Sequence, residues 1–146
     1  MAETVRDSID VKASAQEIFD VATDFDAYPE WNPNIKKVEI EQRDDTGMPV
    51  RVWMEVDAKL KVVSYSLGYD YSEAPESFSW SLIEGDVKEL RGSYKFDEFD
   101  DVTEVTYEMT VDPGFPLPKL LKRQANRQIV RSALEDLKAR VEGSGA

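Results

Sequence analysis

The period of the apolar positions changes along this chain and divides it into regions. Residues 3–11 alternate apolar and polar side chains with a period of two, which predicts a β-strand. Ser14 and Glu17 have the spacing of a capping box in front of an apolar stripe with helical spacing, so we expect a helix running to about Thr23. Two prolines within residues 26–33 predict a short second helix or an irregular corner.

The period of two returns between Ile35 and Val111, where turn residues interrupt it repeatedly. The interruptions are rich in Asp, Gly and Pro, which form tight turns. Short strands that follow one another with only turns between them predict an antiparallel meander. The six expected strands span approximately residues 35–43, 49–57, 60–71, 77–84, 87–97 and 103–111.

Alternation also predicts which side chains of these strands face the interior, because successive side chains point to opposite faces of a sheet. The strand at 60–71 is the least regular, and there we expect the aromatic side to face inward because small residues occupy the other side. The predicted inward residues are Val50, Val52, Met54, Val56, Val63, Tyr65, Leu67, Tyr69, Tyr71, Phe78, Trp80, Leu82, Leu90, Gly92, Tyr94, Phe96, Val105, Tyr107, Met109 and Val111.

A long helix is expected from Leu117 to about Glu142, because this stretch has no glycine and only one proline, near its start. Residues 143–146 should form a frayed end. Segment 119–140 contains seven basic and two acidic residues, a surplus of +5 in a chain of net charge −12. These basic residues either complement an acidic rim of the sheet or dock on an anionic membrane surface or an acidic partner.

The face of this helix changes character along its length. A projection at 100° per residue places Leu137 at the centre of an apolar face in the second half. In the first half the same face carries Asn126 and Arg123, while Leu117 and Leu121 project almost opposite. Either the helix bends just before Asn126, or its first half presents Arg123 and Asn126 to a partly wet end of a cavity.

The composition favours one soluble α+β domain spanning residues 1–146, with its core at about 3–142. Hydrophobic residues make up 41% of the 146 positions, which is enough to offset the entropy of the chain. The net charge of −12 would repel a phosphate backbone, so we expect no nucleic-acid partner. No stretch is apolar enough to cross a membrane and no secretory leader is visible, so we expect a cytoplasmic protein.

The residue types present limit the chemistry. The chain has no cysteine and no histidine, which excludes disulfides, thiol nucleophiles, Ser-His-Asp triads and the usual zinc sites. Its 30 carboxylates include no EF-hand spacing. We therefore expect no metal and no cofactor, and the sequence points to no catalytic residue.

Three local sequences carry a resemblance to a known family. They are YPEWNP at 28–33, FSWSLIEGD at 78–86 and VDPG at 111–114. Together with the order of the elements, they resemble actinobacterial members of the polyketide cyclase/dehydrase and lipid transport family of the START-like superfamily, over about residues 3–142. The resemblance implies a helix-grip fold: a strand, two short helices, six antiparallel strands and a long C-terminal helix packed on the curved sheet, with an apolar cavity between sheet and helix.

These observations favour a protein that binds or carries a small hydrophobic ligand, such as a lipid, a polyketide or an isoprenoid-like molecule. The alternatives are a cofactor-independent polyketide aromatase/cyclase and a protein-interaction module without a ligand. The oligomeric state, monomer or dimer, stays open. The residues expected to line the cavity are Trp31, Met54, Tyr65, Trp80, Tyr94, Tyr107, Met109, Arg123 and Asn126.

Two interpretations of the role of Arg123 remain open. Its side chain either reaches solvent and pairs with the acidic residues at 97–101, or it joins Asn126 as a polar anchor for a carboxylate, hydroxyl or carbonyl of an otherwise apolar ligand.

Overall fold

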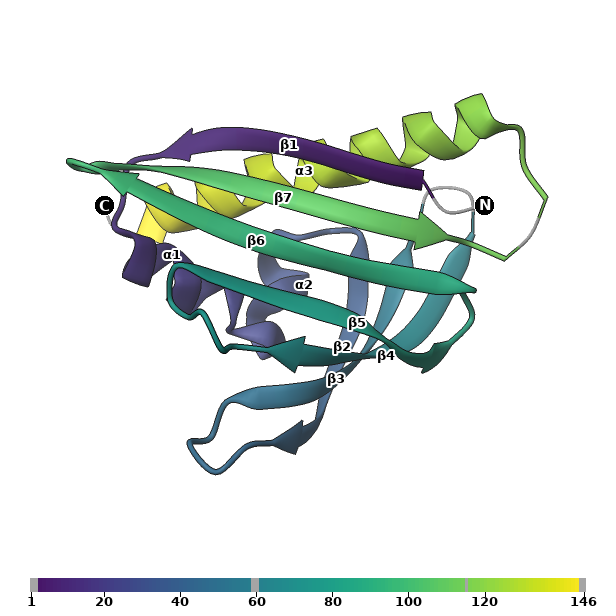
Figure 1. Ribbon diagram of the computed structural model, residues 1–146, viewed down its shortest axis with the longest axis horizontal. Coiled ribbons are helices and arrows are strands. Elements are labelled where there is room, and N and C mark those ends of the chain that lie inside the picture. The colour runs from purple at the N-terminus through teal and green to yellow at the C-terminus, as the bar shows by residue number, and fades with distance from the viewer. Residues whose placement is uncertain (1–2, 59–60, 115, 145–146) are drawn as a thin grey trace.

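A computed structural model describes residues 3–58, 61–114 and 116–144 and confirms the expected α+β helix-grip architecture (Figure 1). The two short helical elements before the second strand form the corner that the prolines predicted. The elements are β1 (Glu3–Val11), α1 (Ala15–Ala22), the 3-10 helix η1 (Phe25–Ala27), α2 (Tyr28–Trp31), β2 (Ile35–Arg43), β3 (Pro49–Asp57), β4 (Val62–Asp70), β5 (Ser77–Gly85), β6 (Glu89–Phe99), β7 (Val102–Asp112) and α3 (Lys119–Ser144).

The seven strands form one antiparallel sheet in the order β1-β7-β6-β5-β4-β3-β2. The first strand returns to the last one: Glu3 pairs with Val111 and Val11 pairs with Thr103. The sheet curves, and α3 lies along its β1 side while α1 and α2 close the concave side (Figure 1). The interior of the protein therefore lies between the sheet and the helices.

The capping box at the start of α1 forms as predicted. The hydroxyl of Ser14 accepts a hydrogen bond from the backbone N–H of Glu17 at 3.1 Å, and the Glu17 carboxylate accepts one from the N–H of Ser14 at 3.4 Å. This reciprocal pair satisfies backbone donors that the first helical turn leaves free. The cap fixes the orientation in which α1 buries Ile18 completely.

Several element ends differ from the sequence prediction. The turn between β6 and β7 is tighter than the break expected at residues 97–101, because Asp100 adopts a left-handed φ of 58°, a conformation that Asp tolerates. The last helix begins at Lys119 rather than Leu117, and it includes Gly143 and Ser144, which we expected to be frayed. Residue 60 of the predicted strand at 60–71, and residues 145–146 of the expected frayed end, lie outside the described residues. Among the helices of the described residues, none is long and apolar enough to span a membrane.

The predicted inward face of the sheet is confirmed as the core, except at Val50, which is partly exposed near the start of β3 and lies outside the core cluster. Val52 and Val105 are fully buried and pack in one cluster with Leu134 and Leu137 of α3. Phe78 holds the aromatic part together, with ring centroids 5.6 Å from those of Phe19, Trp80 and Tyr94. The inward side chains that stay partly exposed within this interior are Tyr65, Tyr69, Tyr71, Leu82, Tyr107 and Val111.

Candidate functional site

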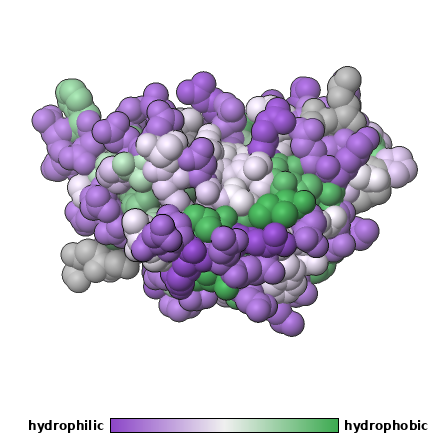
Figure 2. Space-filling model, turned by 60° about the horizontal axis from the view of Figure 1, so that its bottom comes forward, coloured by the Kyte–Doolittle hydropathy of each residue, from purple (hydrophilic) through white to green (hydrophobic). Residues whose placement is uncertain are grey.

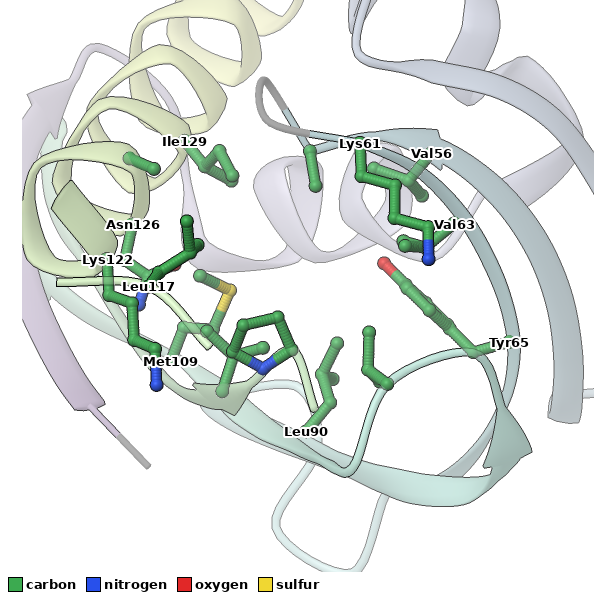
Figure 3. Close-up of a pocket in the computed structure, with 15 residues that line it drawn as sticks. Val56, Lys61, Val63, Tyr65, Leu90, Met109, Leu117, Lys122, Asn126 and Ile129 are labelled. Carbon is green, nitrogen blue, oxygen red and sulfur yellow. The ribbon is translucent and has the colours of Figure 1, made fainter. Parts of the chain in front are cut away.

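A first cavity, of about 80 Å³, lies between the early turns of α3 and the inner face of the sheet (Figure 3). Its walls are mostly aliphatic, with Val56, Val63, Leu90, Val111 and Ile129 among them. Its polar lining residues are few, and Figure 3 shows them on different walls: Tyr65 reaches in from β4 and Asn126 from α3, while Lys61 and Lys122 stand on opposite sides.

A second cavity, of about 70 Å³, adjoins the first, because Tyr65, Leu90 and Met109 line both. It is richer in aromatic rings than the first cavity. Its lining also includes Tyr28, Trp31, Asn32, Ile35, Met54, Leu67, Tyr69, Trp80, Tyr94, Tyr107 and Ala133. The side chains of the three shared residues form the partition between the two spaces.

Asn126 is an uncharged polar residue of α3 that lines the first cavity. The residue is only 7% exposed, and its side-chain Nδ2 has no hydrogen-bond partner among the described residues. The structure has one continuous α3 from Lys119 to Ser144, so the helix presents Asn126 to the cavity without an interruption. An amide N–H that is buried without a partner costs about 1–3 kcal/mol.

Trp31 provides a second donor of the same kind, in the second cavity. Its indole Nε1 is buried and has no partner within the described part of the chain. The residue ends α2, and its ring meets that of Tyr28 edge to face at 5.0 Å between centroids. Each of the two adjoining cavities is therefore lined by one residue with a buried N–H donor that lacks an acceptor among the described residues.

The tyrosine hydroxyls of the cavity walls add neutral polar groups. Tyr107 contacts the sulfur of Met109 at 3.8 Å, a weak interaction, and in the described residues neither Tyr65 nor Tyr94 makes a side-chain hydrogen bond. Burial raises the pKa of Tyr65, Tyr94 and Tyr107 above the ordinary value of 10.0. These hydroxyls stay protonated at neutral pH and can donate or accept hydrogen bonds.

Groups suited to proton abstraction are scarce at this site. No described residue that lines either cavity is an Asp or a Glu, and the chain contains no histidine. Among the described residues, no group of three or more carboxylates is placed to hold a metal ion. The arrangement is suited to enclosing an apolar molecule and to satisfying a few of its acceptors.

Arg123 lies elsewhere. Its side chain is 51% exposed and pairs with Glu3 at 3.6 Å, in an open groove beside β1 that Arg127 and Arg131 also line. The alternative in which it pairs with residues 97–101 is wrong, because the strand register puts that turn at the opposite end of β7 from Glu3.

Eight of the nine residues named from the sequence line one of the two cavities, and Arg123 does not. Sequence reasoning missed other lining residues. Tyr69 and Leu90 were on the predicted inward face, so alternation alone could have added them. Lys61 and Lys122 had no such signal, because only the tertiary packing brings them to opposite sides of the same cavity. Leu117 was expected opposite the buried face, but it precedes α3 and lines the first cavity.

The architecture, with two cavities between the sheet and the helices, is a helix-grip fold, and comparison with solved structures agrees. A START superfamily protein from Mycobacterium smegmatis superposes with a TM-score of 0.88 at 24% identity, covering 96% of this chain and 97% of the other. A protein from Thermus thermophilus superposes with a TM-score of 0.84 at 18% identity, covering 99% of this chain and 100% of the other. The Zhui aromatase/cyclase from Streptomyces sp. R1128 superposes with a TM-score of 0.82 at 16% identity, covering 97% of this chain and 94% of the other.

The family itself is shown by the sequence. The model of the polyketide cyclase/dehydrase and lipid transport family matches residues 11–138, and the chain belongs to this family. A search of curated protein sequences finds no match. At these identities the structural neighbours establish the fold alone, so the function has to be argued from the cavities.

Proposed function

We propose that this protein binds one small, largely apolar ligand in the two adjoining cavities and acts as a carrier rather than as an enzyme. The observation that carries the proposal is the pair of buried donors without partners among the described residues, Nδ2 of Asn126, which lines the first cavity, and Nε1 of Trp31, which lines the second. A ligand that spans both cavities and carries oxygen acceptors, such as carbonyl or ether groups, would satisfy both.

The chemistry of the lining supports an uncharged interior part of the ligand. Apart from two lysines, the polar groups of the described lining are neutral: amides, an indole and protonated tyrosines, set among aliphatic and aromatic walls. A carboxylate placed among them would lose its hydration without gaining a cation, which is costly. Among the described lining residues, only Lys61 and Lys122, at the first cavity, are positively charged, so an acidic group of the ligand would be held there.

The cavities have to enlarge when a ligand binds. Volumes of about 80 and 70 Å³ are well below the roughly 300–1,000 Å³ of common ligand sites. The partition of Tyr65, Leu90 and Met109 is the place where they can join, because Met is unbranched and adopts several rotamers at little cost. We therefore expect binding to move the side chain of Met109 and to merge the two spaces.

The aromatase/cyclase alternative shares this cavity but needs a group that moves protons. The tyrosines have raised pKa values, which favours them as donors and opposes a role as general bases. The absence of carboxylates from the described lining supports binding over catalysis. Turnover of a poly-β-ketone substrate by the purified protein would favour the enzyme instead.

The first experiment is native mass spectrometry of the purified protein, followed by denaturing extraction and identification of any small molecule. We expect a stoichiometric apolar adduct. If the protein is isolated without a ligand, a displacement assay replaces the mass spectrometry. A hydrophobic fluorescent probe is bound first, and fatty acids, quinones and aromatic polyketides are tested for their ability to displace it. Failure of every such molecule to displace the probe, or to bind at all, would contradict the proposal.

The donor role is tested with a matched pair of tryptophan substitutions. Trp31→Phe removes the unpaired Nε1 but keeps a ring, whereas Trp53→Phe changes an indole on the other face of β3, away from both cavities. Only Trp31→Phe should weaken binding of the identified ligand or of the probe. Equal affinities for the two variants would show that the indole N–H takes no part.

A further inference from the structure

The first half of α3 is strongly basic in an acidic protein. Residues 116–134 include five basic residues and no acidic one, in a chain of net charge −12. Arg123 and Arg131 have carboxylate partners on β1, Glu3 and Asp7 respectively. Lys119 and Arg127 are exposed, and no ion pair is formed by either within the described residues. Carboxylates of the sheet therefore pair with only some of the basic residues in the first half of α3.

Exposed leucines lie in the same turns as these basic residues. Leu120 is 65% exposed and Leu121 is 45% exposed, although the surface is otherwise largely hydrophilic, with apolar residues confined to a few patches in the view of Figure 2. Figure 1 shows these first turns of α3 projecting past the end of β1, where they are not covered by the sheet. Packing inside the protein therefore does not explain two adjacent exposed leucines.

We propose that the segment Lys119–Arg127 docks on an anionic lipid bilayer, with Leu120 and Leu121 inserted among the lipids and the basic side chains on the headgroups. Exposed apolar residues flanked by Lys and Arg are the pattern of helices that lie at a membrane interface. Each basic residue near an anionic surface strengthens such binding about fivefold. The chain as a whole is repelled by that surface, so the local basic surplus must carry the attraction.

The position of the segment gives the docking a consequence. Lys122, Ala125 and Asn126 of the same turns line the first cavity, and Leu117 lines it just before the helix begins. A bilayer that takes up Leu120 and Leu121 therefore lies beside that cavity, at the place where an apolar molecule would pass between lipid and protein. The docking itself does not depend on the proposed ligand, so the two ideas can fail separately.

An acidic protein partner is the competing occupant of this surface. The exposure of two leucines at the tip of a projecting helix favours lipid, because a bilayer accepts protruding side chains without a complementary groove. The basic side chains would attract either partner. The test therefore has to distinguish insertion of the leucines into a bilayer from electrostatic attraction alone.

The test is co-sedimentation of the full-length protein with vesicles of phosphatidylcholine alone and with about 30% phosphatidylglycerol. We expect binding to the anionic vesicles only, weakening as salt is raised. Leu120→Ser/Leu121→Ser should reduce the affinity at least about fivefold, and Lys119→Glu/Arg127→Glu should reduce it on the order of tenfold or more. Circular dichroism checks that each variant is folded.

Two control variants make these results specific. Phe99→Ser removes a side chain that is 79% exposed at the β6–β7 turn, at the opposite end of the sheet from the first turns of α3, and Lys36→Glu/Lys37→Glu changes the net charge as much as the basic double variant does. Neither should alter binding by more than about twofold.

The insertion is followed with Leu120→Trp, whose added fluorescence should shift to the blue on anionic vesicles and be quenched by brominated lipid. Absence of binding to anionic vesicles at low salt would overturn the proposal. So would binding that survives the leucine substitutions or that falls equally in the control variants. Salt-sensitive binding of an acidic protein without any vesicle binding would assign the surface to that class of partner and would also overturn it.

Discussion

The indole of Trp80 lies directly over the backbone of Gly92 on the neighbouring strand. A β-carbon at Gly92 would stand 2.6 Å from Cε2 and Cζ2 of that ring, which no real structure tolerates. The ring cannot simply turn aside, because Tyr94 and Tyr107 pack against it with centroids 5.5 and 5.7 Å away. The second cavity therefore has its present wall only because position 92 lacks a side chain.

Gly92→Ala should accordingly destabilise the protein by about 1–3 kcal/mol, as overpacking of a core does. It should also change the near-ultraviolet circular dichroism, because the surroundings of Trp80 shift. Gly143→Ala is the matched control, since nothing lies within 4 Å of a β-carbon there, and it should be neutral or slightly stabilising. Equal unfolding temperatures for the two variants would contradict this account of Trp80.

Asn126→Leu should have opposite effects on stability and on binding. The substitution keeps the branched shape of the side chain but removes a buried Nδ2 without a partner, so the ligand-free protein should gain about 1 kcal/mol of unfolding free energy. The affinity for a ligand with acceptor groups should fall because the donor is lost. Gln128→Leu, at an exposed position of the same helix, should change neither quantity. Chemical unfolding and probe titration measure the two effects, and a loss of stability in Asn126→Leu would contradict the prediction.

Met109→Ala should open the partition between the cavities. The change removes a side chain that lines both spaces, so it should cost about 2–5 kcal/mol of stability while increasing the binding of a bulky hydrophobic probe. Met109→Leu keeps the volume and should cost less than about 1.5 kcal/mol. If probe binding is the same in both variants, Met109 does not limit the size of the ligand.

Stability should fall steeply in alkaline solution. Burial raises the pKa of Tyr28, Tyr65, Tyr69, Tyr94 and Tyr107 above 10.0 in the folded protein. From about pH 10 the unfolded chain releases these protons and the folded chain keeps them, so the unfolded state binds fewer protons and the unfolding free energy decreases as pH rises.

Each tyrosine contributes up to about 1.4 kcal/mol per pH unit in that range. Absorbance at the tyrosinate wavelength should therefore rise together with the loss of circular dichroism, in one cooperative step. Tyr107→Phe, which removes only a weak contact to Met109, should make the pH dependence shallower. Gradual ionisation of all tyrosines in a protein that remains folded would contradict the assignment of these rings to the interior.

The sequence by itself determined much of this protein. Its change of hydrophobic period predicted the strands and the long helix, and alternation predicted that residues such as Val52 and Phe78 form the core. The lack of histidine and cysteine fixed which chemistries are absent. These conclusions follow from local patterns, because a residue's face within a strand or helix depends only on its position in that element.

Only the tertiary structure decided how the site is assembled. Asn126 and Trp31 come from elements far apart in the sequence, and their lack of partners depends on the groups that all the neighbouring elements bring. Arg123 pairs with Glu3 because the register of β1 on β7 places that carboxylate beside α3. The pairing of strands as far apart in the sequence as β1 and β7, the curvature of the sheet and the start of α3 depend on packing across the whole protein, and no single segment of the sequence contains that information.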